Sequence, residues 1–233
     1  MRPAADEPRF HPIVAVVAWL SVFVFSTAAV AVIIAIAGYS ASQPDDWPLW
    51  LVGLAQLPLW GGYFSVAIVV SRVRGTGRWR RDYGLQFRAV DLWGVPAGAL
   101  TQLVFVWLLY RLLDLFINVH DVDKPARQLT DRANGWGVVI LVLIVGLGAP
   151  FFEELFFRGL IMRAIQSYFD DTLALIGSAI VFAAVHFELL QFPALLLFGL
   201  VAGYCAQRTG RLGMSICAHI GFNMTTVVIL LTS

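Results

Sequence analysis

Charged residues and cysteines are both scarce in this chain. Asp, Glu, Lys and Arg make up 13% of its 233 residues, and the formal net charge is +1. A chain with no excess charge of one sign has no global field that could gather nucleic acid or acidic substrates. The two cysteines, Cys205 and Cys217, lie within apolar stretches. They predict small buried side chains and exclude the disulfide framework of a small secreted domain.

Apolar residues are abundant instead. They make up 59% of the sequence, and the mean hydropathy is +0.78, well above that of soluble domains. A helix needs about 20 predominantly apolar residues to cross the roughly 30 Å hydrocarbon core of a bilayer. The sequence therefore predicts an all-α, polytopic transmembrane helix bundle with about seven spans, at 13–38, 49–70, 92–113, 136–157, 172–190, 193–206 and 212–231.

The first apolar segment has some features of a secretory signal. Arg2 and Arg9 precede it, and residues 35–37 (Ala-Ile-Ala) are similar to a signal-peptidase site. Its apolar run is about twice the usual signal length of 7–15 residues, so we predict an uncleaved span. We divide the chain into an N-terminal three-span region with a basic loop, 1–135, and a C-terminal helix bundle, 136–233.

Basic residues in the connections predict the orientation, because Lys and Arg near span ends favour the cytoplasmic side. If the N-terminus is inside, the outer segments hold four of them, Arg111, Lys124, Arg127 and Arg132. The inner segments hold twelve: Arg2, Arg9, Arg72, Arg74, Arg78, Arg80, Arg81, Arg88, Arg158, Arg163, Arg208 and Arg211. We predict a plasma-membrane protein with a cytoplasmic N-terminus, whose basic loop 72–88 touches anionic lipid headgroups and does not bind nucleic acid.

Ionisable side chains inside apolar spans are costly, so each is a candidate functional residue. The C-terminal spans hold Glu153, Glu154, Arg158, His186 and His219, with Asn223 beside the last. On a helix, Glu154 and Arg158 are four residues apart with the acid first, which favours an ion pair. Glu153 is turned by about 100° and has no local partner. Arginine can thus hold one glutamate while the other acts as a base, although an ion pair that only fastens the helix is the structural alternative.

Three of the predicted spans bring polar residues to one level. If spans four and five form an antiparallel hairpin at Asp170, Glu153 lies 17 residues before the turn and His186 lies 16 after it. A rise of about 1.5 Å per residue places both at nearly the same depth. His219 and Asn223 are four apart and share one helical face. Each residue alone could serve interhelical hydrogen bonding, but together they favour a common functional centre.

These residues resemble the motifs of a known family. Residues 153–158 (Glu-Glu-Leu-Phe-Phe-Arg), Phe182-x-x-x-His186 and His219-x-x-x-Asn223 stand in the order and spacing of the three motifs of the CPBP family. This family comprises the CAAX-processing and bacteriocin-processing (Abi) intramembrane proteases, and the resemblance covers residues from about 136 to 231. It implies a membrane endopeptidase in which Glu153 activates water with help from His186. The residues at His219 and Asn223 would then stabilise the oxyanion.

The resemblance leaves two mechanisms open. Glu153, His186 and His219 could bind zinc, since His and carboxylate ligands suit that ion. A glutamate base with His and Asn as oxyanion donors needs no metal. We favour the metal-free mechanism and assign no metal, because Asn is a poor zinc ligand but a good hydrogen-bond donor. Glu154 and Arg158 are then supporting residues.

The expected partners are the lipid bilayer and a membrane-associated protein or peptide substrate, and CAAX cleavage in particular requires a prenylated substrate. The alternative function is a non-catalytic bacteriocin-immunity or scaffold protein that binds a partner through the same polar cluster. A transporter with proton-relaying carboxylates is less favoured, because the sequence has no paired broken helices or inverted halves.

Overall fold

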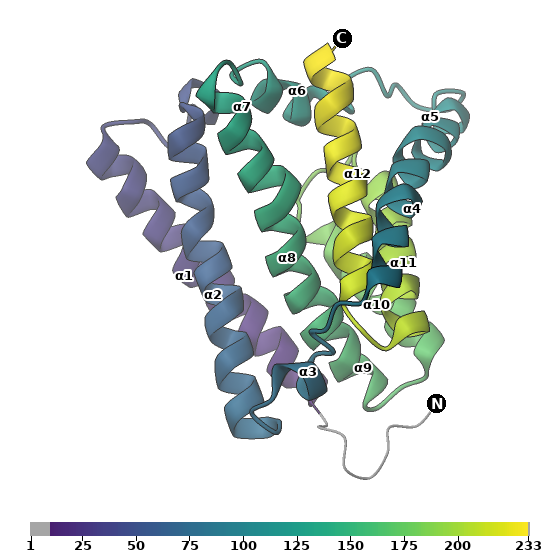
Figure 1. Ribbon diagram of the computed structural model, residues 1–233. Helices are drawn as coiled ribbons and strands as arrows, with labels where there is room; N and C mark the ends of the chain where they lie inside the picture. The colour runs from purple at the N-terminus through teal and green to yellow at the C-terminus, as the bar shows by residue number, and fades with distance from the viewer. Residues whose placement is uncertain (1–9, 233) are drawn as a thin grey trace.

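The computed structural model describes residues 10–232, and this part of the chain is helical and contains no strand (Figure 1). The predicted all-α fold is confirmed. The N-terminal helices are α1 (Pro12–Ala37), α2 (Leu49–Arg74) and the short α3 (Trp79–Asp82). The elements that follow are the 3₁₀ turn η2 (Ala89–Trp93), α4 (Gly94–Leu100), the π-helical η3 (Thr101–Val106), α5 (Trp107–Leu113), α6 (Lys124–Thr130), α7 (Trp136–Leu141), the π-helical η4 (Val142–Gly148), α8 (Ala149–Glu154), the π-helical η5 (Leu155–Met162), α9 (Arg163–Gln166), α10 (Asp171–Ala184), α11 (Phe192–Thr209) and α12 (Gly213–Thr232).

Several of these elements join end to end. The stretch from η2 to α5 forms one helical segment over 89–113, and the stretch from α7 to α9 forms another over 136–166. With α1, α2 and α12 they are the five segments, among the described residues, that are long and apolar enough to cross a membrane. All seven predicted segments are helical, but α10 has only 14 residues and α11 has 18. The predicted number of spans, about seven, is therefore approximate.

Two predicted span ends are wrong. The fourth segment was expected to end at 157, where charged residues gather, yet the helix continues to Gln166. It can do so because both terminal nitrogens of Arg158 bond to groups inside the protein, Nη1 to Glu154 and Nη2 to the carbonyl of Gly199. The fifth was expected to reach 190, yet α10 ends at Ala184. Phe187 has a φ of 56°, a left-handed conformation in which a helix cannot continue.

The turn between the fourth and fifth segments is confirmed near Asp170. This residue caps α10, and its side chain accepts a hydrogen bond from the backbone N–H of Leu173. The helices on either side of the turn are antiparallel neighbours. This arrangement carries Glu153 and His186 to the same depth.

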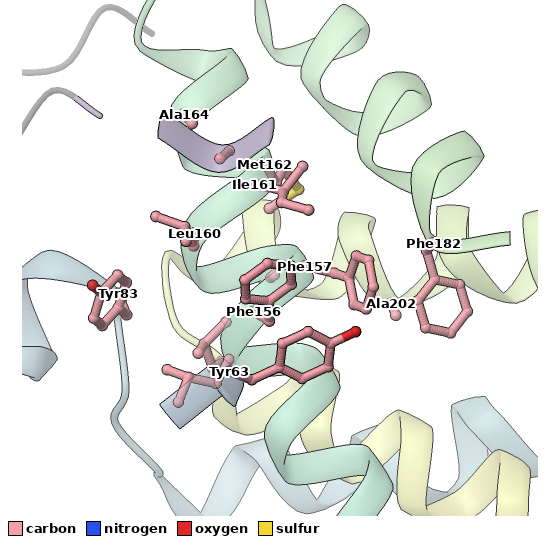
Figure 2. Close-up of a cluster of buried hydrophobic side chains, with 14 of the residues drawn as sticks. Tyr63, Tyr83, Phe156, Phe157, Leu160, Ile161, Met162, Ala164, Phe182 and Ala202 are labelled. Carbon is pink, nitrogen blue, oxygen red and sulfur yellow. The ribbon is translucent and has the colours of Figure 1, made fainter. Parts of the chain in front are cut away.

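An aromatic core fills the space between these helices and α2 (Figure 2). The rings of Tyr63 and Phe156 stack with centroids 4.2 Å apart. Phe157 contacts Phe182 edge to face at 5.3 Å, and all four side chains are buried. Such offset and edge-to-face contacts add to the stabilisation from burial, and they fix η5 against α2 and α10.

Small residues four apart bring the C-terminal helices close together. A methyl group at Gly199 would lie 3.0 Å from Cβ of Ala179, and one at Gly203 would lie 2.6 Å from a methyl of Leu175. These contacts join α11 to α10. Both cysteines are free and buried, as predicted.

The outer surface of the bundle is apolar. Large apolar side chains along α1 face outward, among them Val24 at 65% exposure and Ile36 at 82%. A continuous exposed apolar surface of this kind is unfavourable in water and marks contact with lipid or protein. Together with the five long apolar segments, it makes this chain a multi-pass membrane protein.

Candidate active site

Glu154 and Arg158 form the ion pair that their spacing predicts. Nη1 of Arg158 lies 2.9 Å from Oε1 of Glu154, and both side chains are fully buried. They lie on either side of the junction between α8 and η5, in the middle of the 136–166 segment. π-Helical turns inside α-helices are frequent at functional sites.

Arg158 was counted among the inner loop residues in the topology prediction, and this assignment is wrong. The residue lies within a helix with none of its surface exposed. Its guanidinium also donates to the carbonyl of Gly199 at 3.0 Å and lies over the ring of Phe182 at 4.4 Å. Removal of Arg158 leaves eleven inner basic residues against four outer ones, so the predicted orientation is unchanged.

The carboxylate of Glu154 is bound on both oxygens. Besides Arg158, its Oε1 lies 2.9 Å from Nδ1 of His219, and its Oε2 accepts a hydrogen bond from the hydroxyl of Ser215. A buried carboxylate is tolerated only when it is paired and hydrogen-bonded in this way. Glu154 therefore anchors the 136–166 segment to α12. Ser215 was not among the predicted site residues, although it lies four residues before His219 on the same helical face.

Glu153 faces two histidines. Its Oε2 lies 3.9 Å from Nε2 of His219 and 4.0 Å from Nε2 of His186. Both distances are too long for a direct hydrogen bond. They suit a water oxygen that bridges the carboxylate and the two imidazole nitrogens. The two glutamates, which are adjacent in sequence, thus have different surroundings. Glu154 is fully bound, whereas Glu153 faces the imidazole nitrogens across a short gap.

His186 lies just beyond the end of α10, not on the helix as expected. Its Nδ1 is 2.7 Å from the carbonyl oxygen of Phe182. A carbonyl can only accept, so Nδ1 carries the proton, and in the neutral ring Nε2 keeps its lone pair. That lone pair faces Glu153. The next residue, Phe187, adopts a left-handed conformation with a φ of 56°, which costs a modest strain.

Asn223 lies one turn from His219 on α12. Its Nδ2 donates to the carbonyl oxygen of Val145 in η4 at 2.8 Å. An amide nitrogen carries two N–H bonds, so this contact leaves one of them for another acceptor. The contact also ties α12 to the helix that carries the glutamates.

One cavity of about 370 Å³ unites these residues. Glu153, His186, His219 and Asn223 all line it, and the remaining wall is mainly apolar, with contributions from α5, α6, α11 and α12. Its size lies in the range of ligand pockets, which place a few polar groups in an apolar wall. The predicted site residues are thus brought together, with Glu154 and Arg158 directly behind them.

The donor types of this site suit zinc, and the contact between Glu154 and Nδ1 of His219 is the kind that orients a zinc-binding histidine. Within residues 10–232, however, no three His, Cys, Asp or Glu side chains lie close enough together to hold a metal ion.

Comparison with known proteins identifies the family of this region. Residues 135–225 match the family model described as type II CAAX prenyl endopeptidase Rce1-like. No curated protein and no solved structure matches the chain. The matched range includes the three motifs and Ser215, which confirms the resemblance to the CAAX-processing proteases. Residues 135–225 of this multi-pass membrane protein are therefore similar to the Rce1-like type II CAAX prenyl endopeptidases, a family of membrane proteases.

Proposed function

We propose that this protein hydrolyses a peptide bond of a membrane-associated protein or peptide, with Glu153 as the base that activates water. The observation that carries the proposal is the position of Oε2 of Glu153, 3.9 and 4.0 Å from the Nε2 atoms of His219 and His186. A water molecule between them can donate one hydrogen to Glu153 and the other to the lone pair of His186. Glu154 cannot take this role, because its oxygens are bound to other groups.

The reaction then follows general base catalysis. Glu153 takes a proton from the water, and the water oxygen adds to the carbonyl carbon of the scissile bond. The carbonyl oxygen becomes an oxyanion. As the C–N bond breaks, Glu153 passes its proton to the leaving nitrogen, so the products are a carboxylic acid and an amine, and the glutamate is restored; the acid then loses its proton to water.

His219 and the spare N–H of Asn223 are the proposed oxyanion donors. The ionised Glu154 can only accept, so Nδ1 of His219 carries a proton. Nε2 donates to the oxyanion only in the ring form that carries a proton on both nitrogens. Loss of one such donor typically lowers the rate by roughly 10²-fold or more.

A substitution of Glu153 tests the assignment of the base. Glu153→Gln keeps the shape of the side chain but cannot accept the proton, so purified protein in detergent should retain its thermal stability and lose cleavage by roughly 10²-fold or more. The probe is a farnesylated peptide that ends in Cys-aliphatic-aliphatic-X, the prenylation signal. Glu188→Gln makes the same chemical change at an exposed position near His186 and should cleave at the wild-type rate.

Two results would contradict this proposal. Unchanged cleavage by a well-folded Glu153→Gln variant would exclude Glu153 as the base. Absence of cleavage in the wild type, together with a binding or immunity phenotype that survives Glu153→Gln, would favour the non-catalytic alternative. Treatment with a zinc chelator separates the two mechanisms, because the proposed one retains full activity after chelation.

We also propose a plasma-membrane location and a cytoplasmic N-terminus, on the basis of the basic residues. A reporter inserted within 74–88 should behave as cytoplasmic and one within 120–130 as external. The cavity reaches α6 and Thr226 near the end of α12, so in this orientation it extends from the glutamates toward the outer side. The reverse reporter pattern would overturn the orientation and the side toward which the cavity extends.

A further inference from the structure

Gln102 presents a buried hydrogen-bond acceptor that no group within residues 10–232 uses. Its side-chain oxygen Oε1 is inaccessible to solvent and has no hydrogen-bond partner within the described part of the chain. The residue lines the same cavity as Glu153, His219 and Asn223. A buried acceptor without a partner has lost its hydrogen bonds to water and has formed none within the protein, which costs free energy. A ligand that donates a hydrogen bond to Oε1 would remove this cost.

The packing of α4 on α12 fixes the depth of Gln102. A Cβ at Gly94 would meet backbone atoms of Met214 and Ala218, and one at Gly98 would meet backbone atoms of Ala218 and Phe222. A step of four residues on α4 thus matches a step of four on α12, so the two helices run parallel, as Figure 1 shows.

Continuation of this register by one turn brings Gln102 to the level of residues 222–226. Asn223, the proposed oxyanion donor, lies at this level on α12. The π-helical segment that begins at Thr101 interrupts the regular turn at this place. Such interruptions commonly re-aim side chains at functional sites. Gln102 belongs to the region before residue 135, outside the family match.

We propose that Oε1 of Gln102 accepts a hydrogen bond from a main-chain N–H of the substrate peptide, close to the bond that is cleaved. This inference rests on the proposed function, since it assigns the cavity to a peptide. The wall of the cavity also includes Val106, Phe222 and Val227, whose side chains offer no donor. A peptide in extended conformation presents its N–H groups at regular intervals and satisfies the orphan oxygen where the protein does not.

The experiment measures binding, so it does not depend on cleavage. Full-length protein carrying Glu153→Gln is titrated with a fluorescent farnesylated peptide that ends in Cys-aliphatic-aliphatic-X. The same titration uses a set of peptides, each N-methylated at one of the last four amides. Gln102→Met in this background removes the acceptor at similar volume. Gln56→Met, on α2 outside the cavity, is the matched control.

We expect one N-methylated peptide to bind the parent roughly 3- to 10-fold more weakly than the unmodified peptide, the effect of one neutral hydrogen bond. Gln102→Met should weaken binding of the unmodified peptide by a similar factor, and N-methylation should then have no further effect. With otherwise wild-type protein, Gln102→Met should raise KM and leave kcat nearly unchanged. Its melting temperature should be no lower than that of the parent, because Oε1 has no bond within the protein to lose.

Other outcomes would overturn the proposal. Equal effects of N-methylation in the parent and in Gln102→Met would show that Gln102 does not bind the peptide amide. A lower melting temperature with unchanged affinity would show a structural role only. No saturable binding by the parent would exclude a peptide from the cavity. Normal binding and the expected Gln102 effects without cleavage by the wild type would refute the catalytic proposal alone.

Discussion

Nη1 of Arg158 lies 2.9 Å from Oε1 of Glu154, and neither side chain has any exposed surface. Removal of one partner would leave the other charge unpaired in a place that water does not reach. Such a loss costs about 3–5 kcal/mol. We therefore expect Arg158→Ala and Glu154→Ala to lower the melting temperature in detergent by several degrees or more and to reduce the yield of folded protein.

An exposed pair with the same spacing provides the control. Arg127 and Asp123 are also four residues apart and form an ion pair at 2.7 Å, but their side chains are 49% and 39% exposed. Exposed pairs contribute about 0–1 kcal/mol, so Arg127→Ala should hardly change the melting temperature. An Arg158→Ala variant that melts like the wild type yet is inactive would mean that the arginine acts directly on the substrate.

The sequence predicts the part of the site that depends on spacing along one helix. The spacing of four residues from Glu154 to Arg158 suffices to predict their pair. The approach of His186 to Glu153 also follows from counting residues on either side of Asp170. The bonds of Glu154 to Ser215 and of Asn223 to Val145 depend on how closely separate helices pack, and no periodicity in one helix contains that information.

The fold shows the same division between local and tertiary information. Hydropathy identifies all seven helical segments, because each is an apolar run that lipid or neighbouring helices can cover. It misplaces the end of the fourth segment, because hydropathy assigns the charged Arg158 to the surface unless its buried partner Glu154 is known. It misplaces the end of α10 as well, since the left-handed turn at Phe187 occurs at an apolar residue that gives no turn signal.

Asp82 links stability to pH outside the membrane-spanning segments. It lies in α3, where its carboxylate accepts hydrogen bonds from the hydroxyl of Ser71 and from the hydroxyl and backbone N–H of Thr76. Burial raises the pKa of this carboxyl, but these hydrogen bonds lower it by more, so its pKa lies below the ordinary value. The ionised form therefore stabilises the fold. This stabilisation is complete above the unfolded-state pKa of about 3.9 and is lost as the pH falls through the folded-state pKa.

We expect the wild type to melt above Asp82→Asn at neutral pH and the difference to shrink below about pH 4. Melting curves of both proteins between neutral and acidic pH measure this difference. Asp46→Asn, at an exposed position, should melt close to the wild type throughout. If the difference in melting temperature between the wild type and Asp82→Asn stays constant down to the lowest pH, the charge of Asp82 does not stabilise the fold.

Gly98 tests the close approach of α4 and α12, on which the depth of Gln102 depends. A Cβ at this position would collide with the carbonyl of Ala218 and the backbone nitrogen of Phe222, and backbone atoms inside a helix cannot move aside alone. Gly98→Ala should force the two helices apart at a cost of about 1–3 kcal/mol, which outweighs the roughly 1 kcal/mol that alanine gains over glycine in a helix.

Gly61→Ala on α2 is the matched control, because nothing lies within 4 Å of its added Cβ, and its melting temperature should stay the same or rise. We expect Gly98→Ala to melt lower than the wild type and to bind peptide more weakly, since Gln102 and Asn223 would move apart. If both glycine variants melt alike, α4 and α12 do not touch at Gly98, and the register that places Gln102 beside Asn223 is wrong.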